Sequence, residues 1–181
     1  TFEPLSRHPN LTIKFNWVKP GQEFGGVTKL FLKNARQDPT LLCEYAASAA
    51  FADAGLPAPR ITHGRVRLND RDLGLCVVAE AINKPFLRRH FKDEHGTLYE
   101  GAFRDIRPGL DQDNGQPSDG SDLAELRSAA RVPDRLERLE ALSKVLDMEA
   151  FLNFLAMEMI VASWDGYALH QNNYRVYHDP A

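Results

Sequence analysis

Apolar and polar residues alternate in four stretches of the first half of the chain. They are residues 11–16 (LTIKFN), 27–33 (VTKLFLK), 60–68 (RITHGRVRL) and 74–82 (GLCVVAEAI). Alternation places every second side chain on one face, which is typical of a β-strand with one buried side. The polar turn at 69–72 between the last two stretches predicts that they form a hairpin.

A helix is expected between the second and third of these strands. Asp38 suits its N-cap and Pro39 its first position, because that position needs no backbone donor. The segment 40–54 is rich in alanine and other helix-forming residues. Gly55 is suited to the C-terminal stop, and Pro57 prevents the helix from continuing. The expected order is therefore strand, strand, helix, strand, strand.

The rest of the chain divides by its polarity. Residues 1–88 carry the pattern just described, residues 89–135 are polar, and residues 136–181 are dominated by helical patterns. Within the polar segment, residues 109–122 (GLDQDNGQPSDGSD) contain too few apolar groups to pack. We therefore expect 89–135 to be a linker or insertion between two lobes, with 136–181 beginning the second lobe.

Two helices and a strand are expected near the end of the chain. Pro133 marks the start of 134–146, in which leucines recur at helical spacing. Asp147 is suited to cap the next helix, 148–164 (MEAFLNFLAMEMIVASW). That helix is apolar nearly all round, which predicts that it is buried. Residues 174–181 (YRVYHDPA) resemble a strand that reaches a turn.

Composition places the chain among ordinary globular proteins. Its 181 residues suit one domain or a two-lobed one, with 43% apolar and 26% charged residues. The net charge of −3 gives no reason to expect a binder of nucleic acid or of membrane surfaces. No apolar run reaches the ~18 residues that a membrane span needs. Cys43 and Cys76 lie in apolar patterns, which favours buried thiols. Neither compartment nor oligomeric state follows from these features.

The candidate chemistry lies between the last helix and the last strand. Asp165 follows the helix, and the adjacent amides Asn172 and Asn173 precede the strand. An acid that orients an acceptor hydroxyl, followed by an amide that helps to hold a metal ion, is the layout of a phosphoryl-transfer loop. The spacing of seven to eight residues differs from the five of the usual protein-kinase loop. The alternative is a turn at Asp165 followed by a pair of capping amides.

A nucleotide-binding lobe needs a strand lysine that contacts phosphate and a helix glutamate that holds the lysine. Lys29 lies on the strand before the helix, and Glu44 lies in an otherwise apolar part of that helix. Lys14 on the preceding strand is the competing partner, and Lys33 is the third candidate. Each lysine could instead be a surface residue. The pair 25–26 (GG) could let the backbone approach phosphate.

These segments together resemble the CotH kinase family, the spore-coat protein H group of atypical protein kinases. The resemblance rests on the order of several loose motifs, which cover most of residues 10–100 and 147–181. They are LTIKF, FGGVTKLFLKNARQDPTLLCEYAA, LPAPRITHGRVRLNDRDLGLCVVAEAINKPFLRRHF and WDGYALHQNNYRVYHDP. Residues 102–135 carry little resemblance.

The resemblance implies an α+β fold, two-lobed and kinase-like, with an antiparallel-sheet N-lobe and a helical C-lobe. It implies binding of ATP with Mg²⁺ or Mn²⁺, and phosphorylation of Ser or Thr in a protein substrate. It also implies a location in a bacterial spore coat, or secreted or at the cell surface.

Site residues follow from the same resemblance. Asp165 would be the catalytic acid, and Asn173 the metal or phosphate contact, with Asn172 as its substitute. Lys29 and Glu44 would form the ion pair. Because Asn is nearly isosteric with Asp, Asp165→Asn is predicted to remove catalysis and to spare folding.

The family pattern also bears on Glu80, on Asp70 and on the end of the chain. Glu80 would lie near the linker where adenine docks, and its alternative role is a structural salt bridge or cap. Asp70 replaces the first glycine of the family's hairpin, a mild departure because Asp tolerates the left-handed conformation. The family pattern continues past residue 181 to a second metal-binding acid. Either the chain is a fragment or that acid is missing, and in both cases the activity is expected of the parent domain.

Two other classes of function remain. One is a pseudokinase or structural coat-type protein that has the same fold and only binds partners. The other is an unrelated hydrolase that pairs His170 with Asp165, although the sequence offers no Ser or Cys in a nucleophile motif.

Overall fold

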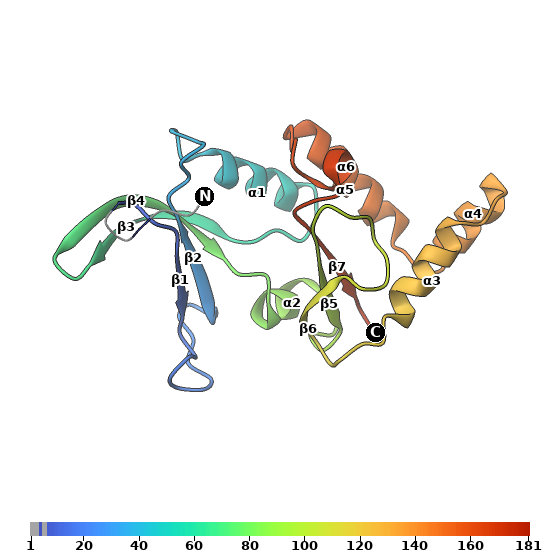
Figure 1. The fold of residues 1–181 in the computed structure, drawn as a ribbon, viewed down its shortest axis with the longest axis horizontal. Helices are drawn as coiled ribbons and strands as arrows, with labels where there is room; N and C mark the ends of the chain where they lie inside the picture. Colours follow the sequence, from blue (N-terminus) through green and yellow to red (C-terminus); the bar gives the residue numbers. More distant parts are fainter. Residues whose placement is uncertain (1–3, 5–6) are drawn as a thin grey trace. The chain divides into compact units, whose positions relative to one another are not determined.

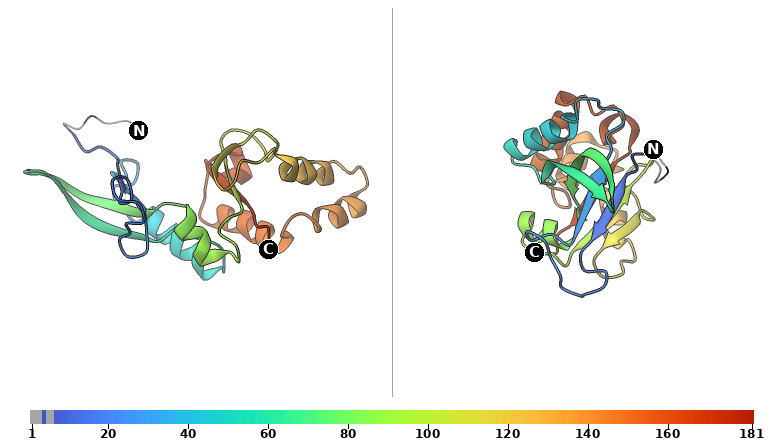
Figure 2. Two further views of the ribbon diagram at one scale, coloured as in Figure 1. Left: turned by 90° about the horizontal axis from the view of Figure 1, so that it is seen from below. Right: turned by 90° about the vertical axis from the view of Figure 1, so that its left-hand side faces the viewer.

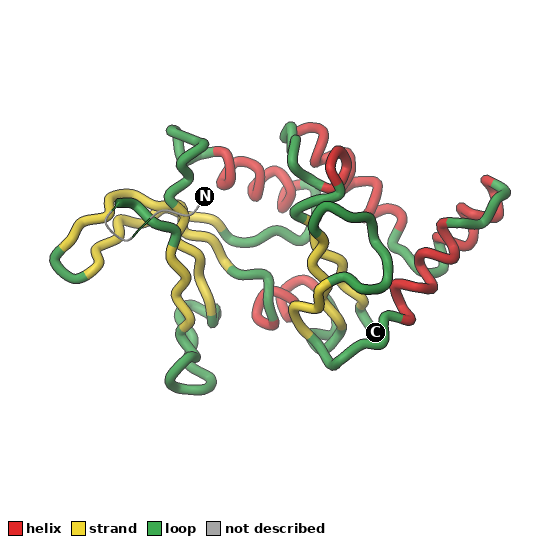
Figure 3. Tube along the Cα trace, viewed as in Figure 1, coloured by secondary structure: helices red, strands yellow, loops and turns green. Residues whose placement is uncertain are grey.

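A computed structural model describes residue 4 and residues 7–181, and it contains two compact units. The first unit ends at His90 and the second begins at Phe91. Both combine antiparallel strands with helices (Figures 1 and 3), so the fold class is α+β as expected.

The first unit is built on a four-stranded antiparallel sheet with the order β1-β2-β4-β3. The strands are β1 (Leu11–Lys14), β2 (Lys29–Lys33), β3 (Ile61–Leu68) and β4 (Arg71–Glu80). All four lie within or close to the stretches that alternate in the sequence. The inner strand β4 carries much of the core, since Val77 and other residues of this strand are almost fully buried.

The hairpin between β3 and β4 turns more tightly than the sequence indicated. Leu68 pairs directly with Arg71, so the turn consists of residues 69–70 rather than 69–72. Asn69 adopts a φ of 54°, a left-handed conformation that asparagine tolerates better than most residues. Figure 2 shows the two strands as a long twisted ribbon.

Helix α1 (Cys43–Asp53) begins later than predicted. Leu41 has a φ of 60°, so residues 38–41 form a turn and not the first helical turn. The prediction of Asp38 as N-cap was wrong, because the N-cap is Leu42; Asp38 instead accepts a hydrogen bond of 2.8 Å at Oδ2 from the backbone N–H of Cys43, the first residue of the helix. The expectation of two buried thiols holds for Cys76 alone, since Cys43 at the helix start is exposed.

The first unit closes with helix α2 (Lys84–His90), which the sequence patterns did not predict. Phe86 and Leu87 of this helix are buried, and Leu87 is completely so. The ring of Phe86 contacts His90 at 4.5 Å between centroids. A short apolar face of this kind is enough to anchor two turns of helix beside the sheet.

The second unit contains a three-stranded antiparallel sheet with the order β6-β5-β7. Its strands are β5 (Thr97–Gly101), β6 (Asp111–Asn114) and β7 (Tyr174–His178). The polar segment 89–135 is therefore not a mere linker, because it supplies two of these strands and helix α3 (Ser121–Ala130). Backbone pairing, which the side-chain pattern does not reveal, holds β6 in the sheet.

Two longer helices and one short helix complete the second unit: α4 (Arg135–Leu142), α5 (Met148–Ile160) and α6 (Tyr167–His170). The prediction that the apolar helix is buried was wrong, since Leu152 is 57% and Ile160 is 73% exposed. The residue of α5 that is buried is instead a carboxylate, Glu158, which is 5% exposed. No helix in the described part of the chain is long and apolar enough to cross a membrane.

The core of the second unit forms around a ring stacked on a glycine. Tyr174 packs with Tyr99, Leu110 and Leu123 in one buried cluster. A methyl group at Gly101, the cross-strand partner of Tyr174, would overlap the Tyr174 ring. The glycine thus allows β7 to enter the core directly after the candidate loop.

Candidate functional site

The candidate loop runs from the end of α5 to the start of β7, residues 161–173. Three of its residues adopt left-handed backbone conformations, namely Ala162 (φ 52°), Gln171 (φ 50°) and Asn173 (φ 53°). Non-glycine residues rarely do so, and they persist there only where the surroundings hold them. The loop is therefore sharply folded on either side of α6.

This folding brings the three predicted residues of the loop together. The Asn172 amide nitrogen donates to Oδ1 of Asp165 at 3.0 Å. The Asn173 amide nitrogen donates to Oδ2 at 2.9 Å and to the backbone carbonyl of Asp165 at 3.0 Å. Asn172 is buried, Asn173 is exposed, and Asp165 lies between these extremes. The acid is thus held at both oxygens while one side of the cluster faces solvent.

The geometry corrects the expectation that Asp165→Asn leaves folding untouched. Both carboxylate oxygens of Asp165 accept a hydrogen bond from an amide. An asparagine offers only one acceptor oxygen, so its NH₂ group would face another NH₂ group. The substitution therefore weakens the loop itself, and it tests catalysis only beside a variant that keeps these hydrogen bonds.

Glu158 supports the loop from inside α5, and the sequence analysis did not identify it. Its Oε1 accepts from the N–H of Tyr167 at 3.0 Å, and its Oε2 accepts from the N–H of Ala168 at 2.7 Å. These donors are the free N–H groups at the start of α6. Gly166 makes room for the contact, because any side chain there would overlap the carboxylate. The available signal was a carboxylate near the C-terminal end of an apolar helix.

Tyrosines fix the loop to the segment that follows β5. The hydroxyl of Tyr167 donates to Oδ1 of Asp105 at 2.7 Å, and that of Tyr174 donates to the carbonyl of Arg104 at 2.7 Å. Burial, and then the neighbouring Asp105, raise the pKa of Tyr167 well above its usual range. Burial raises the pKa of Tyr174 to about 12. Both hydroxyls therefore remain protonated donors at neutral pH.

The donor set of the loop suits a hard cation in type. Mg²⁺ prefers carboxylate and amide oxygens. Asp165 supplies a carboxylate, and the amide oxygen of Asn173 accepts no hydrogen bond from the described residues, because the contacts of this side chain use its nitrogen. Among residues 4 and 7–181 there is no group of three or more His, Cys, Asp or Glu side chains arranged to hold a metal. The loop thus fits part of a ligand set.

In the first unit, Glu44 binds a different lysine from the one expected. Its Oε2 lies 2.5 Å from Nζ of Lys33, the third candidate, and not beside Lys29 or Lys14. Nζ of Lys29 lies 5.3 Å from the ring of Phe31. Lys29 and Lys14 are direct cross-strand partners, an arrangement that costs stability unless an anion lies nearby. The described chain provides no carboxylate partner for either.

Glu80 takes the structural alternative left open for it. Its two oxygens bind the guanidinium of Arg89 at 2.6 and 2.7 Å, and Arg60 also donates to Glu80 through its backbone and side chain. The side chain of Glu80 is 2% exposed. Burial alone would raise its pKa, but the hydrogen bonds from Arg89 and Arg60 outweigh burial and hold the pKa at about 2. Glu80 is therefore a buried ionic anchor between β4 and α2.

The Asp–His pair of the alternative hydrolase is not formed. Nδ1 of His170 lies 2.5 Å from the carbonyl oxygen of Trp164, while the carboxylate of Asp165 is occupied by the two amides. The contact of His170 therefore joins the end of α6 to Trp164, which precedes this helix.

A family model described as "CotH kinase protein" matches residues 6–181. Invasin CotH3 of Rhizopus delemar is 26% identical over 96% of this chain and 32% of its own length. Spore coat protein homolog 1 of the same fungus is 24% identical over 98% of this chain and 32% of its own. The chain thus spans about a third of the length of these relatives.

Proposed function

The chain belongs to the CotH kinase family, and on that premise we propose that it takes part in ATP-dependent transfer of a phosphoryl group to a Ser or Thr hydroxyl of a protein. The observation that supports this most strongly is the cluster of Asp165, Asn172 and Asn173 at the start and end of one tightly held loop. An acid paired to amides in this way suits the orientation of an acceptor hydroxyl.

Asp165 retains the capacity for this role in spite of its two amide contacts. A carboxylate has about four lone-pair positions, and the amides use two of them. Its remaining positions can accept the proton of a substrate hydroxyl, and the partial exposure of the residue gives a substrate access. The amides keep the carboxylate in one orientation, so little reorganisation is needed when the hydroxyl arrives.

A divalent ion, when bound, would neutralise negative charge that develops on the phosphate oxygens. The side chains of this chain that would hold it are Asp165 and Asn173, with Asn172 too buried to do more than orient the acid. Asn173 presents its amide oxygen because its nitrogen is engaged with Asp165.

In the first unit, we propose that Lys29 contacts the phosphates of the nucleotide and that Lys14 assists. Their ammonium groups lie on directly paired residues without a carboxylate partner in the described chain, so an anion would relieve their repulsion. The Lys33–Glu44 pair would then hold α1 against β2. In this proposal Lys29 contacts phosphate without forming the expected ion pair with Glu44, because Glu44 binds Lys33.

A second candidate function follows from what the relatives are called. Of the two relatives reported above, one is named an invasin and the other a spore coat protein homolog. A coat or surface protein that binds partners without catalysis would have the same fold, and we propose a coat or surface location under either function.

The two functions are separated by a variant that moves the charge and keeps the hydrogen bonds. In Asp165→Asn with Asn172→Asp, the new amide of residue 165 can donate to the new carboxylate of residue 172, and its oxygen can still accept from Asn173. Phosphate transfer from labelled ATP to protein Ser or Thr is measured in the natural protein and in both the single and the double variant. The kinase proposal predicts loss of at least about a hundredfold in both, with stability recovered in the double variant. Activity that returns with stability would show that Asp165 is structural.

A further inference from the structure

A cavity of about 590 Å³ lies in the second unit, beside the loop that carries Asp165. Tyr167 and Gln171 of that loop form part of its wall. The volume falls in the range of ordinary ligand pockets. None of the roles proposed so far uses this cavity.

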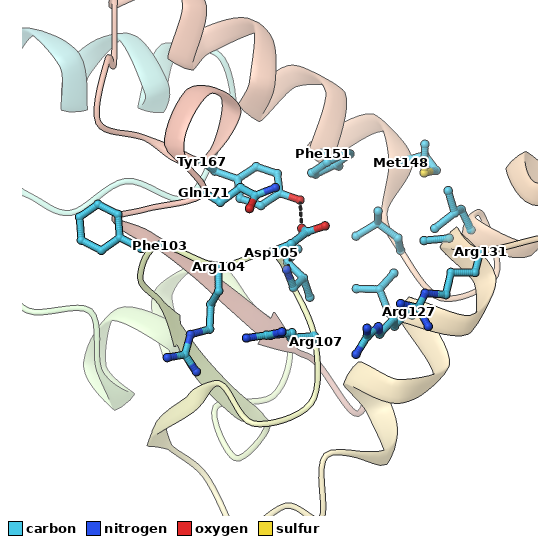
Figure 4. Close-up of a pocket in the computed structure, with 15 residues that line it drawn as sticks. Phe103, Arg104, Asp105, Arg107, Arg127, Arg131, Met148, Phe151, Tyr167 and Gln171 are labelled. Atoms are coloured by element: carbon cyan, nitrogen blue, oxygen red, sulfur yellow. Dashed lines mark hydrogen bonds between the residues drawn. The ribbon is translucent and has the colours of Figure 1, made fainter.

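One side of the cavity is lined by arginines. They come from two separate segments, the loop after β5 and the end of α3, and they are Arg104, Arg107, Arg127 and Arg131. Figure 4 shows the four along one side of the cavity, with Met148 and Phe151 on the opposite side. Two segments thus converge to place positive charge on one wall.

These arginines are not paired with carboxylates of the described residues. Within the described part of the chain, none of the four guanidinium groups forms an ion pair. Arg104 makes one long hydrogen bond of 3.4 Å to the carbonyl of Gly109. Three of the four are exposed and Arg127 is partly buried, so an anion from solvent can reach them, and their combined positive charge attracts one.

The one carboxylate of the cavity lining is already engaged. Asp105 accepts a hydrogen bond of 2.7 Å from the hydroxyl of Tyr167, and its Oδ1 also accepts from the backbone N–H of Ile106 at 2.7 Å. Its charge offsets only part of the charge of four arginines. The wall therefore has a surplus of positive charge beside an apolar surface.

We propose that this cavity binds a phosphoserine or phosphothreonine of a protein segment, with an apolar neighbour of that residue against Met148 and Phe151. A phosphate monoester carries nearly two negative charges and three acceptor oxygens, so it can satisfy several guanidinium groups at once. A single carboxylate satisfies fewer. The choice of a phosphorylated segment rests on the proposed function, since a Ser/Thr kinase produces such groups; the charge of the cavity does not rest on it.

The proposed site would affect which substrates the proposed kinase prefers. It lies against Tyr167 and Gln171, which belong to the loop of the candidate acid. A segment already phosphorylated at one residue would be held next to that loop, so a substrate with several Ser or Thr residues would be favoured after its first modification. Binding here is a docking contact and involves no bond formation.

The test measures the affinity of the chain for a fluorescent peptide that carries one phosphoserine next to a leucine. The same peptide without phosphate, the peptide with glutamate in place of phosphoserine, and inorganic phosphate as competitor are measured in parallel. The proposal predicts that the phosphopeptide binds at least about tenfold tighter than the other two peptides, and that its binding weakens as salt is raised. It also predicts that inorganic phosphate competes only weakly.

Variants decide whether the cavity is responsible. Arg107→Gln and Arg127→Gln should each weaken binding of the phosphopeptide by about tenfold, because each removes a charge-assisted contact. Arg135→Gln, an exposed arginine at the start of α4 outside the lining, is the matched control and should leave affinity unchanged. Equal affinity for the glutamate and phosphoserine peptides, equal affinity for inorganic phosphate, or insensitivity to both variants would each overturn the proposal.

The phosphopeptide-binding experiment and the phosphate-transfer experiment can succeed or fail independently. Phosphopeptide binding needs neither ATP nor metal, and it is measured on the chain without any reaction. Binding that depends on Arg107 and Arg127 in a protein that transfers no phosphate would leave this site standing and remove the kinase function. Phosphate transfer without phosphopeptide binding would do the reverse.

Discussion

Substitution of Glu158 by Gln gives the sharpest test of how the candidate loop is held. Glu158 is 5% exposed, and each of its oxygens accepts one backbone N–H from the start of α6. A glutamine keeps the size of the side chain and removes one acceptor and the charge. Its NH₂ group must then face the N–H of Tyr167 or Ala168.

The cost can be worked out from these contacts. A hydrogen bond to a charged group contributes about 1.5–3 kcal/mol, and a buried donor left without a partner costs about 1–3 kcal/mol. One bond is lost outright and the other becomes an ordinary neutral bond. We therefore expect Glu158→Gln to lower the free energy of unfolding of the second unit by about 2–4 kcal/mol.

The assay is denaturant unfolding followed by a probe of the second unit, such as the fluorescence of Trp164, which lies next to Asp165. Glu149→Gln is the matched control, because Glu149 lies exposed on the same helix. The control should change stability by less than about 0.5 kcal/mol. A loss of under about 0.5 kcal/mol for Glu158→Gln as well would refute the view that Glu158 anchors the loop.

Three further outcomes are expected. The folded pKa of Glu80, about 2, lies below its usual value of 4.5. Its ion pairs therefore stabilise the first unit fully above about pH 4.5 and lose up to about 3 kcal/mol as the pH falls toward 2. Acid unfolding of Glu80→Gln should accordingly show a weaker pH dependence, and an unchanged dependence would count against this role. Gly101→Ala should destabilise the second unit by about 1–3 kcal/mol or more, since the methyl group would overlap Tyr174; thermal melts would show it, and an unshifted melt would contradict the packing. Glu44→Gln should loosen α1, with a loss of under about 1 kcal/mol because the Lys33 pair is half-exposed; proteolysis between 34 and 55 would rise, and unchanged protection would speak against the pair.

The sequence predicted well where side-chain pattern determines structure. The alternation in the chain located all four strands of the first sheet, although their burial differs: β1 contains no buried residue, whereas β4 buries the adjacent residues Cys76 and Val77. The sequence failed for β6, Asp111–Asn114, which has no apolar residue to alternate. Its place comes from backbone pairing with β5, a contact between segments that no local pattern encodes.

The candidate site shows the same division. Asp165, Asn172 and Asn173 are near in sequence, and the loop was expected to bring them together because the three belong to one turn-rich segment. The lysine partner of Glu44 was not predictable in the same way. Lys29 and Lys33 lie on the same face of β2, about 13 Å apart. Which of the two lysines Glu44 reaches therefore depends on where α1 begins. Helix α1 begins after Leu41, whose left-handed backbone conformation could not be predicted from the sequence.

The exposure of α5 is a further case. Its composition predicted burial, yet Leu152 and Ile160 are exposed while Glu158 is buried. Hydrophobicity predicts that a helix tends to be covered; it does not specify which of its faces packs within a given unit. The carboxylate is inside because the N–H groups at the start of α6 need an acceptor.

The measurement that tests the central claim most directly is the melting temperature of the natural protein with and without ATP and Mg²⁺ or Mn²⁺. A ligand that binds only the folded state must raise it, by the equivalent of about 2.7 kcal/mol at a concentration one hundred times its dissociation constant. The kinase proposal predicts a rise that requires both nucleotide and metal and that is reduced in Lys29→Ala. An unchanged melting temperature at millimolar ATP with either metal would contradict it and would favour a coat or surface protein that binds partners only.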